Sequence, residues 1–100
     1  MKISSIEKIV TYLKNKKEFF YDRFGVTSMG VFGSFVRDEQ TALSDIDMVI
    51  EMEKDRKNIH SLLQLKRFLE KELERKVDLG FENSLKPVVK EKLKGRIIYV

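Results

Sequence analysis

The sequence has 100 residues, of which 42% are hydrophobic and 36% are charged, with five glycines and one proline. This composition excludes a disordered or a fibrous chain, and the length predicts one domain over residues 1–100 with a single hydrophobic core. No apolar run approaches the about 20 residues needed to span a bilayer, and a chain without cysteine has no disulfide or thiolate metal site. We therefore expect a cytoplasmic protein without a membrane partner.

The net charge is +4, and the excess of positive charge lies in the second half of the chain. Residues 1–50 hold seven Lys or Arg and seven Asp or Glu, whereas residues 51–100 hold thirteen and nine. A cationic surface could attract an anionic substrate such as a nucleotide, but a solvated lysine-rich helix produces the same pattern. We do not expect nucleic acid as a direct partner.

Segments with helical hydrophobic spacing alternate with extended segments along the chain. In chain order we first predict a helix over residues 4–23 that Gly25 ends, and then strands at 26–32 and 45–52. A second helix over 56–75, with Asp55 as its N-cap, should be followed by a strand at 76–81. The last elements are a helix at 87–94 that Gly95 ends and a strand at 96–100. The connector between the first two strands is too short for a crossover helix, so these strands should be antiparallel neighbours. The prediction is an α+β fold, with helices packed on a mixed sheet of about four strands.

The apolar positions of the two long helices recur three or four residues apart, which indicates amphipathic helices that pack on the sheet. They are Ile6, Ile9, Val10, Leu13, Phe20 and Phe24 in the first helix, and Ile59, Leu62, Leu63, Leu65, Leu69 and Leu73 in the second.

Two aspartates interrupt the apolar pattern of the strand at 45–52. Residues two apart on a strand point to the same face, so Asp45 and Asp47 should project side by side while Ile46 and Met48 face the opposite way. Two carboxylates this close repel each other unless one is protonated or a cation lies between them. Mg²⁺ is a suitable cation because it favours hard oxygen ligands, although a pair of surface acids at a strand end has the same spacing.

A Gly-Ser pair, Gly33 and Ser34, ends the preceding strand. A glycine there permits a tight turn, and the N–H groups and the Ser34 hydroxyl that follow can bind a phosphate close to Asp45. Asp78 should face away from the core on the third strand, where it could join the two aspartates and act as a general base. Three clustered acids suit two divalent ions. Taken alone, each feature is also typical of an ordinary turn or a surface strand.

The pattern G-S-x10-D-x-D, formed by Gly33, Ser34, Asp45 and Asp47, resembles the signature of the DNA polymerase β nucleotidyltransferase superfamily. The segments "MGVFGSFVRDEQTALSDIDMVIE", "KVDLGF" and "KPVVKEKLKGRIIYV" resemble the minimal nucleotidyltransferases, which are single-domain proteins often partnered with a HEPN-type toxin. The resemblance implies that the Gly-Ser pair holds a nucleoside triphosphate. It also implies that Asp45, Asp47 and Asp78 bind two Mg²⁺ ions and that Asp78 acts as the base.

Arg37 matches the arginine that usually follows the Gly-Ser pair in this family, and it would bind the nucleotide. The family commonly has a glycine next, whereas this chain has Asp38 followed by Glu39. Two acids beside a triphosphate would disfavour its binding unless they point outward.

The resemblance implies an enzyme that transfers AMP from ATP to a hydroxyl. The acceptor would be a tyrosine of a HEPN ribonuclease toxin, which makes the chain an antitoxin. Two alternatives stay open: an antitoxin that silences its toxin by occlusion alone, and a catalytic subunit that modifies a small molecule or an RNA end bound by a partner. A partner is expected because 100 residues leave no room for a separate acceptor-binding domain, and self-association is left open.

Overall fold

The computed structural model describes residues 5–37, 39–41, 44–85, 87–88 and 96–100, which form three α-helices and a four-stranded mixed sheet. The helices are α1 (Ile6–Asn15), α2 (Lys17–Phe24) and α3 (Ile59–Leu73), and the strands are β1 (Val26–Phe32), β2 (Ile46–Met52), β3 (Val77–Phe81) and β4 (Ile98–Tyr99). Short 3₁₀ helices lie at Gly33–Phe35, here called the Gly-Ser turn, and at Glu82–Ser84. The predicted α+β fold with a mixed sheet is confirmed.

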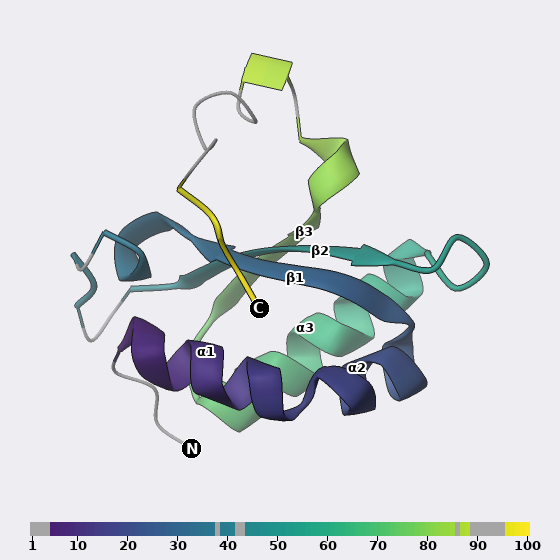
Figure 1. Cartoon of the computed structure of the whole chain (residues 1–100), viewed down its shortest axis with the longest axis horizontal. Helices are drawn as coiled ribbons and strands as arrows, with labels where there is room; N and C mark the ends of the chain where they lie inside the picture. The colour runs from purple at the N-terminus through teal and green to yellow at the C-terminus, as the bar shows by residue number, and fades with distance from the viewer. Residues whose placement is uncertain (1–4, 38, 42–43, 86, 89–95) are drawn as a thin grey trace.

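The strand order of the sheet is β3-β2-β1-β4. β1 pairs antiparallel with β2 and with β4, whereas β2 and β3 run parallel and are connected through α3. The first two strands are therefore antiparallel neighbours, as their short connector predicts. Figure 1 shows α1, α2 and α3 together on one side of the strands, so the helices cover one face of the sheet.

The helices bury the sheet face to which alternate residues of β2 point. Ile46 and Met48 are 0% and 1% exposed, and they share one core with Leu65 and Leu69 of α3. Successive residues of a strand point to opposite faces, so Asp47 projects from the face that the helices leave uncovered. The alternation of apolar and acidic residues in β2 thus separates the core from the candidate site.

The predicted helix over residues 4–23 is in fact two helices, because the chain leaves helical geometry at Lys16 (φ −115°, ψ 14°). The Lys16 Nζ lies 5.7 Å from the ring centroid of Phe68 and 3.2 Å from Oε1 of Glu72, both on α3. These tertiary contacts hold the break, although the apolar spacing continues through it. Gly25 does end α2, with a left-handed φ of 75°.

The second predicted helix is shorter than expected and has a different N-cap. α3 begins after Asn58, whose Oδ1 accepts a hydrogen bond from the Ser61 N–H at 2.7 Å, whereas Asp55 lies in the preceding turn. Ile59 and Leu63 share the apolar spacing of this helix, but they are 63% and 46% exposed. The fully buried leucines lie in the later turns of α3, so apolar spacing alone does not show how much of a helix is covered.

The C-terminal part of the chain is described only in part. The predicted helix at 87–94 and Gly95 lie outside the described residues, except for Pro87 and Val88, which are helical. The last strand is shorter than predicted and pairs with β1 through Gly30 and Val31. Among the residues that the structure describes, no helix is both long and apolar enough to cross a bilayer.

Candidate active site

The candidate site forms where β1 ends and where β2 and β3 begin. The register pairs Phe32, the last residue of β1, with Asp47, and it pairs Asp47 with Asp78 on β3. Neighbouring strands lie about 4.8 Å apart, so the two aspartates project from adjacent positions of the uncovered face. Asp45 is exposed and lies directly before the first residue of β2. The prediction had placed Asp45 inside this strand, so the predicted strand began one residue too early.

Gly33 turns the chain directly beside Asp47. Its φ is 81°, in the left-handed region that favours glycine, and its carbonyl accepts hydrogen bonds from the N–H groups of Val36 and Arg37 at 3.1 and 3.2 Å. A Cβ at this position would overlap Oδ2 of Asp47 and lie 2.9 Å from its Cγ. Glycine is therefore required here by the backbone conformation and also by the close approach of the carboxylate.

The surroundings of Asp47 disfavour the ionised form of its carboxyl. Burial raises the pKa of Asp47 above its ordinary value, the negative charges of Asp78 and Asp45 raise it further, and the positive charge of Arg37 opposes the shift. The register of β2 and β3, which pairs Asp47 with Asp78, accounts for the effect of the Asp78 charge. In the described part of the chain, no three acidic or histidine side chains lie close enough together to form a ready metal-binding group.

The chemistry of this donor set fits a hard divalent cation. Carboxylate oxygens are the ligands that Mg²⁺ prefers, and a cation would favour the ionised form of Asp47, which burial and the neighbouring acids disfavour. Mg²⁺ is typically held by one or two carboxylates together with substrate phosphates, so a nucleotide at the Gly-Ser turn could supply the missing ligands. The structure therefore offers a site that substrate and cation could complete together.

Arg37 and Glu39 follow the Gly-Ser turn and pair with each other. The Arg37 Nε lies 3.1 Å from Oε2 of Glu39, and the two side chains are 52% and 64% exposed. An exposed pair of this kind contributes at most about 1 kcal/mol, so Arg37 can exchange Glu39 for a bound anion. Ser34 is half-buried and its carbonyl accepts the Glu39 N–H at 2.9 Å, while Asp38 lies outside the described residues.

Arg75 holds the loop before Asp45, and the sequence analysis missed this residue. Its Nη1 donates to the carbonyl oxygens of Thr41 at 2.9 Å and Ser44 at 2.8 Å, and its Cζ lies 4.9 Å from the ring centroid of Phe35 in the Gly-Ser turn. An arginine just before a predicted strand has no distinctive pattern, so no sequence signal could have identified it.

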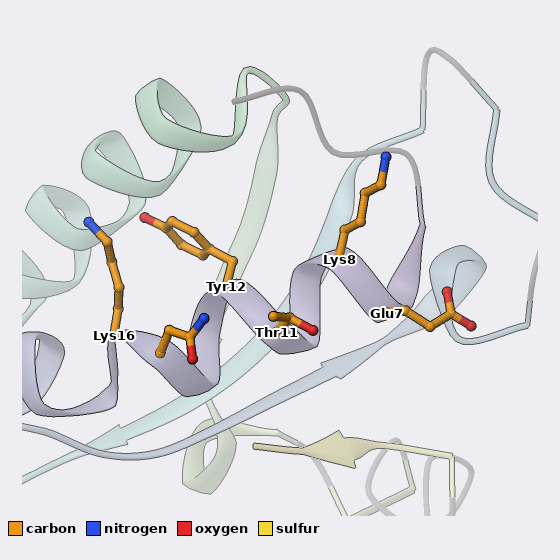
Figure 2. Close-up of a pocket in the computed structure, with 6 residues that line it drawn as sticks. Glu7, Lys8, Thr11, Tyr12 and Lys16 are labelled. Atoms are coloured by element: carbon orange, nitrogen blue, oxygen red, sulfur yellow. The ribbon is translucent and has the colours of Figure 1, made fainter.

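A cavity of about 470 Å³ lies along α1. It is lined by Glu7, Lys8, Thr11, Tyr12, Asn15 and Lys16. Figure 2 shows Glu7, Lys8, Thr11 and Tyr12 along α1, with Lys16 directly after the helix. Tyr12 is buried and its hydroxyl donates to Oε1 of Glu72 at 3.1 Å, so its ring is not free to stack on a nucleotide base. Because none of the predicted site residues lines this cavity, we do not assign it to the nucleotide.

Replacing Asp47 by asparagine should raise the thermal stability of the metal-free protein at neutral pH. The raised pKa of Asp47 means that its ionised form is less favourable in the folded than in the unfolded chain. This cost is present above the raised pKa and disappears as the pH falls below the ordinary value of 3.8, where both states bind the proton. In EDTA at about pH 7.5, calorimetry should place the Tm of the variant a few degrees above wild type.

The difference in Tm should shrink as the pH falls toward 3.8, the ordinary pKa of the carboxyl, because the folded protein then binds a proton at Asp47 more readily than the unfolded chain does. A Tm of Asp47→Asn at or below the wild-type value at about pH 7.5 would show that folding does not disfavour the ionised carboxylate of Asp47.

Comparison with known sequences identifies relatives that span the chain. The profile of the family described as "Nucleotidyltransferase domain" matches residues 13–100. A Thermococcus cleftensis chain named protein adenylyltransferase MntA is 33% identical over 100 residues, which is 100% of each chain. A Methanocaldococcus jannaschii chain assigned as a protein adenylyltransferase is 35% identical and covers 98% of this chain and 100% of its own.

Solved structures share the same fold. The structure of a chain described as a minimal nucleotidyltransferase aligns with a TM-score of 0.77 at 27% identity and covers 95% of each chain. The crystal structure of a toxin–antitoxin with AMP-PNP aligns with a TM-score of 0.67 at 22% identity, over 93% of this chain and 69% of that chain. The second likeness is evidence for the fold alone.

Proposed function

The chain belongs to the nucleotidyltransferase family, and from this premise we propose that it transfers AMP from ATP to a hydroxyl group of a partner protein. The observation that carries the proposal is the close approach of Gly33 to the Asp47 carboxylate, which brings the turn suited to phosphate next to the acids suited to a cation. The name of the Thermococcus relative, protein adenylyltransferase MntA, supports AMP as the transferred group and a protein as the acceptor.

The Gly-Ser turn binds the triphosphate in the proposed reaction. Gly33 lets the nucleotide approach the backbone closely, and the Ser34 hydroxyl donates a hydrogen bond to a phosphate oxygen. Arg37 exchanges its exposed partner Glu39 for the charge of the triphosphate. These contacts orient the nucleotide with its pyrophosphate toward the turn and its α-phosphorus toward the carboxylates.

Asp45, Asp47 and Asp78 would hold two Mg²⁺ ions, and the chemistry that such ions would supply is stabilisation of the charge that develops during the transfer. Asp78 lies on β3, one strand further from the Gly-Ser turn than Asp47. That location suits a base that accepts the proton of the attacking hydroxyl, because attack and departure occur on opposite sides of the phosphorus.

The proposed acceptor is a tyrosine hydroxyl of a HEPN-type ribonuclease toxin, and the chain would be its cytoplasmic antitoxin. The sequence resemblance to minimal nucleotidyltransferases is the main support for this partner. The Thermococcus relative also shares the name MntA with a solved toxin–antitoxin MntA-HpeT complex, and one chain of that structure is similar to this chain in fold.

The test combines the purified chain, a purified candidate toxin, Mg²⁺ and ATP labelled at the α-phosphate. We expect label on the toxin, an equal amount of released pyrophosphate, and no transfer when EDTA replaces Mg²⁺. ATP labelled at the γ-phosphate is the matched control, because only a phosphotransferase would transfer that label. Label that appears on a small molecule or an RNA end, and not on protein, would reject the protein acceptor.

Occlusion without catalysis is the second candidate function. The ion pair between Arg37 and Glu39 favours this function, because the arginine that would bind the triphosphate is already paired with a carboxylate of the same chain. A chain that works in this way should protect against its toxin without ATP, and it should show no heat of binding when Mg·ATP is titrated into it.

A further inference from the structure

The segment Arg75–Lys76 holds the residues on both sides of Asp45. The Ser44 carbonyl accepts a hydrogen bond from the Arg75 Nη1 at 2.8 Å, and the Ile46 N–H donates to the Lys76 carbonyl at 2.9 Å. Asp45 is exposed and lies outside β2, so neither burial nor strand pairing of its own fixes its position. Its backbone is fixed instead by these two flanking hydrogen bonds.

Arg75 also connects this loop to the Gly-Ser turn. Its Nη1 donates to the Thr41 carbonyl at 2.9 Å, and its guanidinium Cζ lies 4.9 Å from the ring centroid of Phe35, which is fully buried. Thr41 and Ser44 are also joined to each other, because the Ser44 N–H donates to the Thr41 carbonyl at 3.1 Å. One guanidinium therefore contacts the loop before Asp45 and the ring beneath the turn that is suited to phosphate.

The segment that carries Arg75 is itself fixed next to Asp78. Val77 directly precedes Asp78, and its N–H donates to Oε2 of Glu70 on α3 at 3.0 Å. Arg75 lies between this anchor and the end of α3, so it reaches the loop from a rigid junction. The positions of Asp45, Asp78 and the Gly-Ser turn are thus linked through one side chain.

We propose that Arg75 is the positioning residue of the metal and nucleotide site, holding Asp45 in register with Asp78 and the Gly-Ser turn. Its Nη1 is engaged by two backbone carbonyls, and through these hydrogen bonds it acts on the loop before Asp45. Lysine cannot replace it, because a compact ammonium group lacks the planar surface that stacks on Phe35 and the fixed fork of donors. The inference rests on the proposed function.

The test compares wild type, Arg75→Lys and the control Arg67→Ala for Mn²⁺ binding by proton relaxation and for the Mg²⁺ dependence of AMP transfer. Arg67 is an exposed arginine of α3 that lines a groove beside α2 and is not one of the site residues. In Arg75→Lys we expect the Mn²⁺ dissociation constant and the half-saturating Mg²⁺ concentration to rise about tenfold or more. Arg67→Ala should keep both wild-type values.

Phe35→Leu is a second variant that keeps a buried apolar side chain but removes the ring under the guanidinium. It should raise the Mn²⁺ dissociation constant and the half-saturating Mg²⁺ concentration by a smaller factor than Arg75→Lys does. If Arg75→Lys does not fold, Phe35→Leu alone tests whether Arg75 positions the site. Unchanged metal constants in these variants would overturn the inference, and so would a lower transfer rate with unchanged constants. If wild type itself binds no Mn²⁺, the proposed function fails, which is a different result.

Discussion

Replacing Asp45 and Asp47 together by asparagine should lower the rate of AMP transfer by a factor of about 100 to 1,000 without unfolding the chain. Asparagine has nearly the same shape as aspartate but carries no charge, so it cannot neutralise a divalent cation. Metal ions contribute several kcal/mol of charge stabilisation in such transition states, and each 1.4 kcal/mol, roughly, is a tenfold change in rate. The measurement is the initial rate of label transfer at saturating Mg²⁺.

The matched control is Asp55→Asn, since Asp55 is exposed and lies beyond the opposite end of β2 from the site. This variant should keep the wild-type rate. Co-expression of the double variant with the toxin separates the two proposed functions, because a catalytic antitoxin would lose its protection while an occluding one would keep it. A wild-type transfer rate in the double variant would disprove the assignment of these two carboxylates.

Gly33→Ala should lower both stability and activity, whereas Gly80→Ala should lower neither. Gly33 has a φ of 81°, and a Cβ there would overlap the Asp47 carboxylate. At Gly80 on β3, no described residue lies within 4 Å of an added Cβ. A left-handed non-glycine residue costs about 1 to 3 kcal/mol, and a displaced carboxylate should reduce transfer by about 100-fold.

Urea unfolding and transfer kinetics of these two variants give the comparison. The midpoint of Gly33→Ala should fall, while that of Gly80→Ala should stay at or slightly above wild type, because alanine loses less conformational entropy in a strand than glycine does. Equal midpoints and equal rates would mean that the backbone at Gly33 relaxes freely and that its contact with Asp47 has no functional consequence.

The sheet was predictable because its signals are local. The strand at 26–32 has the predicted bounds, since the segment between Gly25 and Gly33 consists mostly of β-branched and apolar residues. The antiparallel pairing of β1 with β2 followed from the length of the connector alone. The predicted site residues Gly33, Asp47 and Asp78 could be selected because acids and a glycine are unusual in apolar strands.

The break at Lys16 and the N-cap of α3 could not be predicted in the same way. The apolar spacing continues through Lys16, and the break depends on contacts with Phe68 and Glu72, which lie more than fifty residues later in the chain. Asp55 and Asn58 are both suitable N-cap residues, and the sequence does not rank them. The structure selects Asn58 through its hydrogen bond to the Ser61 N–H.

The sequence alone determined the class of fold, the order of its strands along the chain and the residue types that point to phosphate and cation chemistry. It could do so because hydrophobic periodicity and the spacing of glycine and aspartate are local properties of the chain. Only the tertiary structure decided that Asp47 lies against Gly33, that Arg37 pairs with Glu39, and that Arg75 reaches the loop before Asp45. These contacts depend on how the Gly-Ser turn, the loop before Asp45 and the segment after α3 meet at one end of the strands. No single stretch of sequence encodes that arrangement.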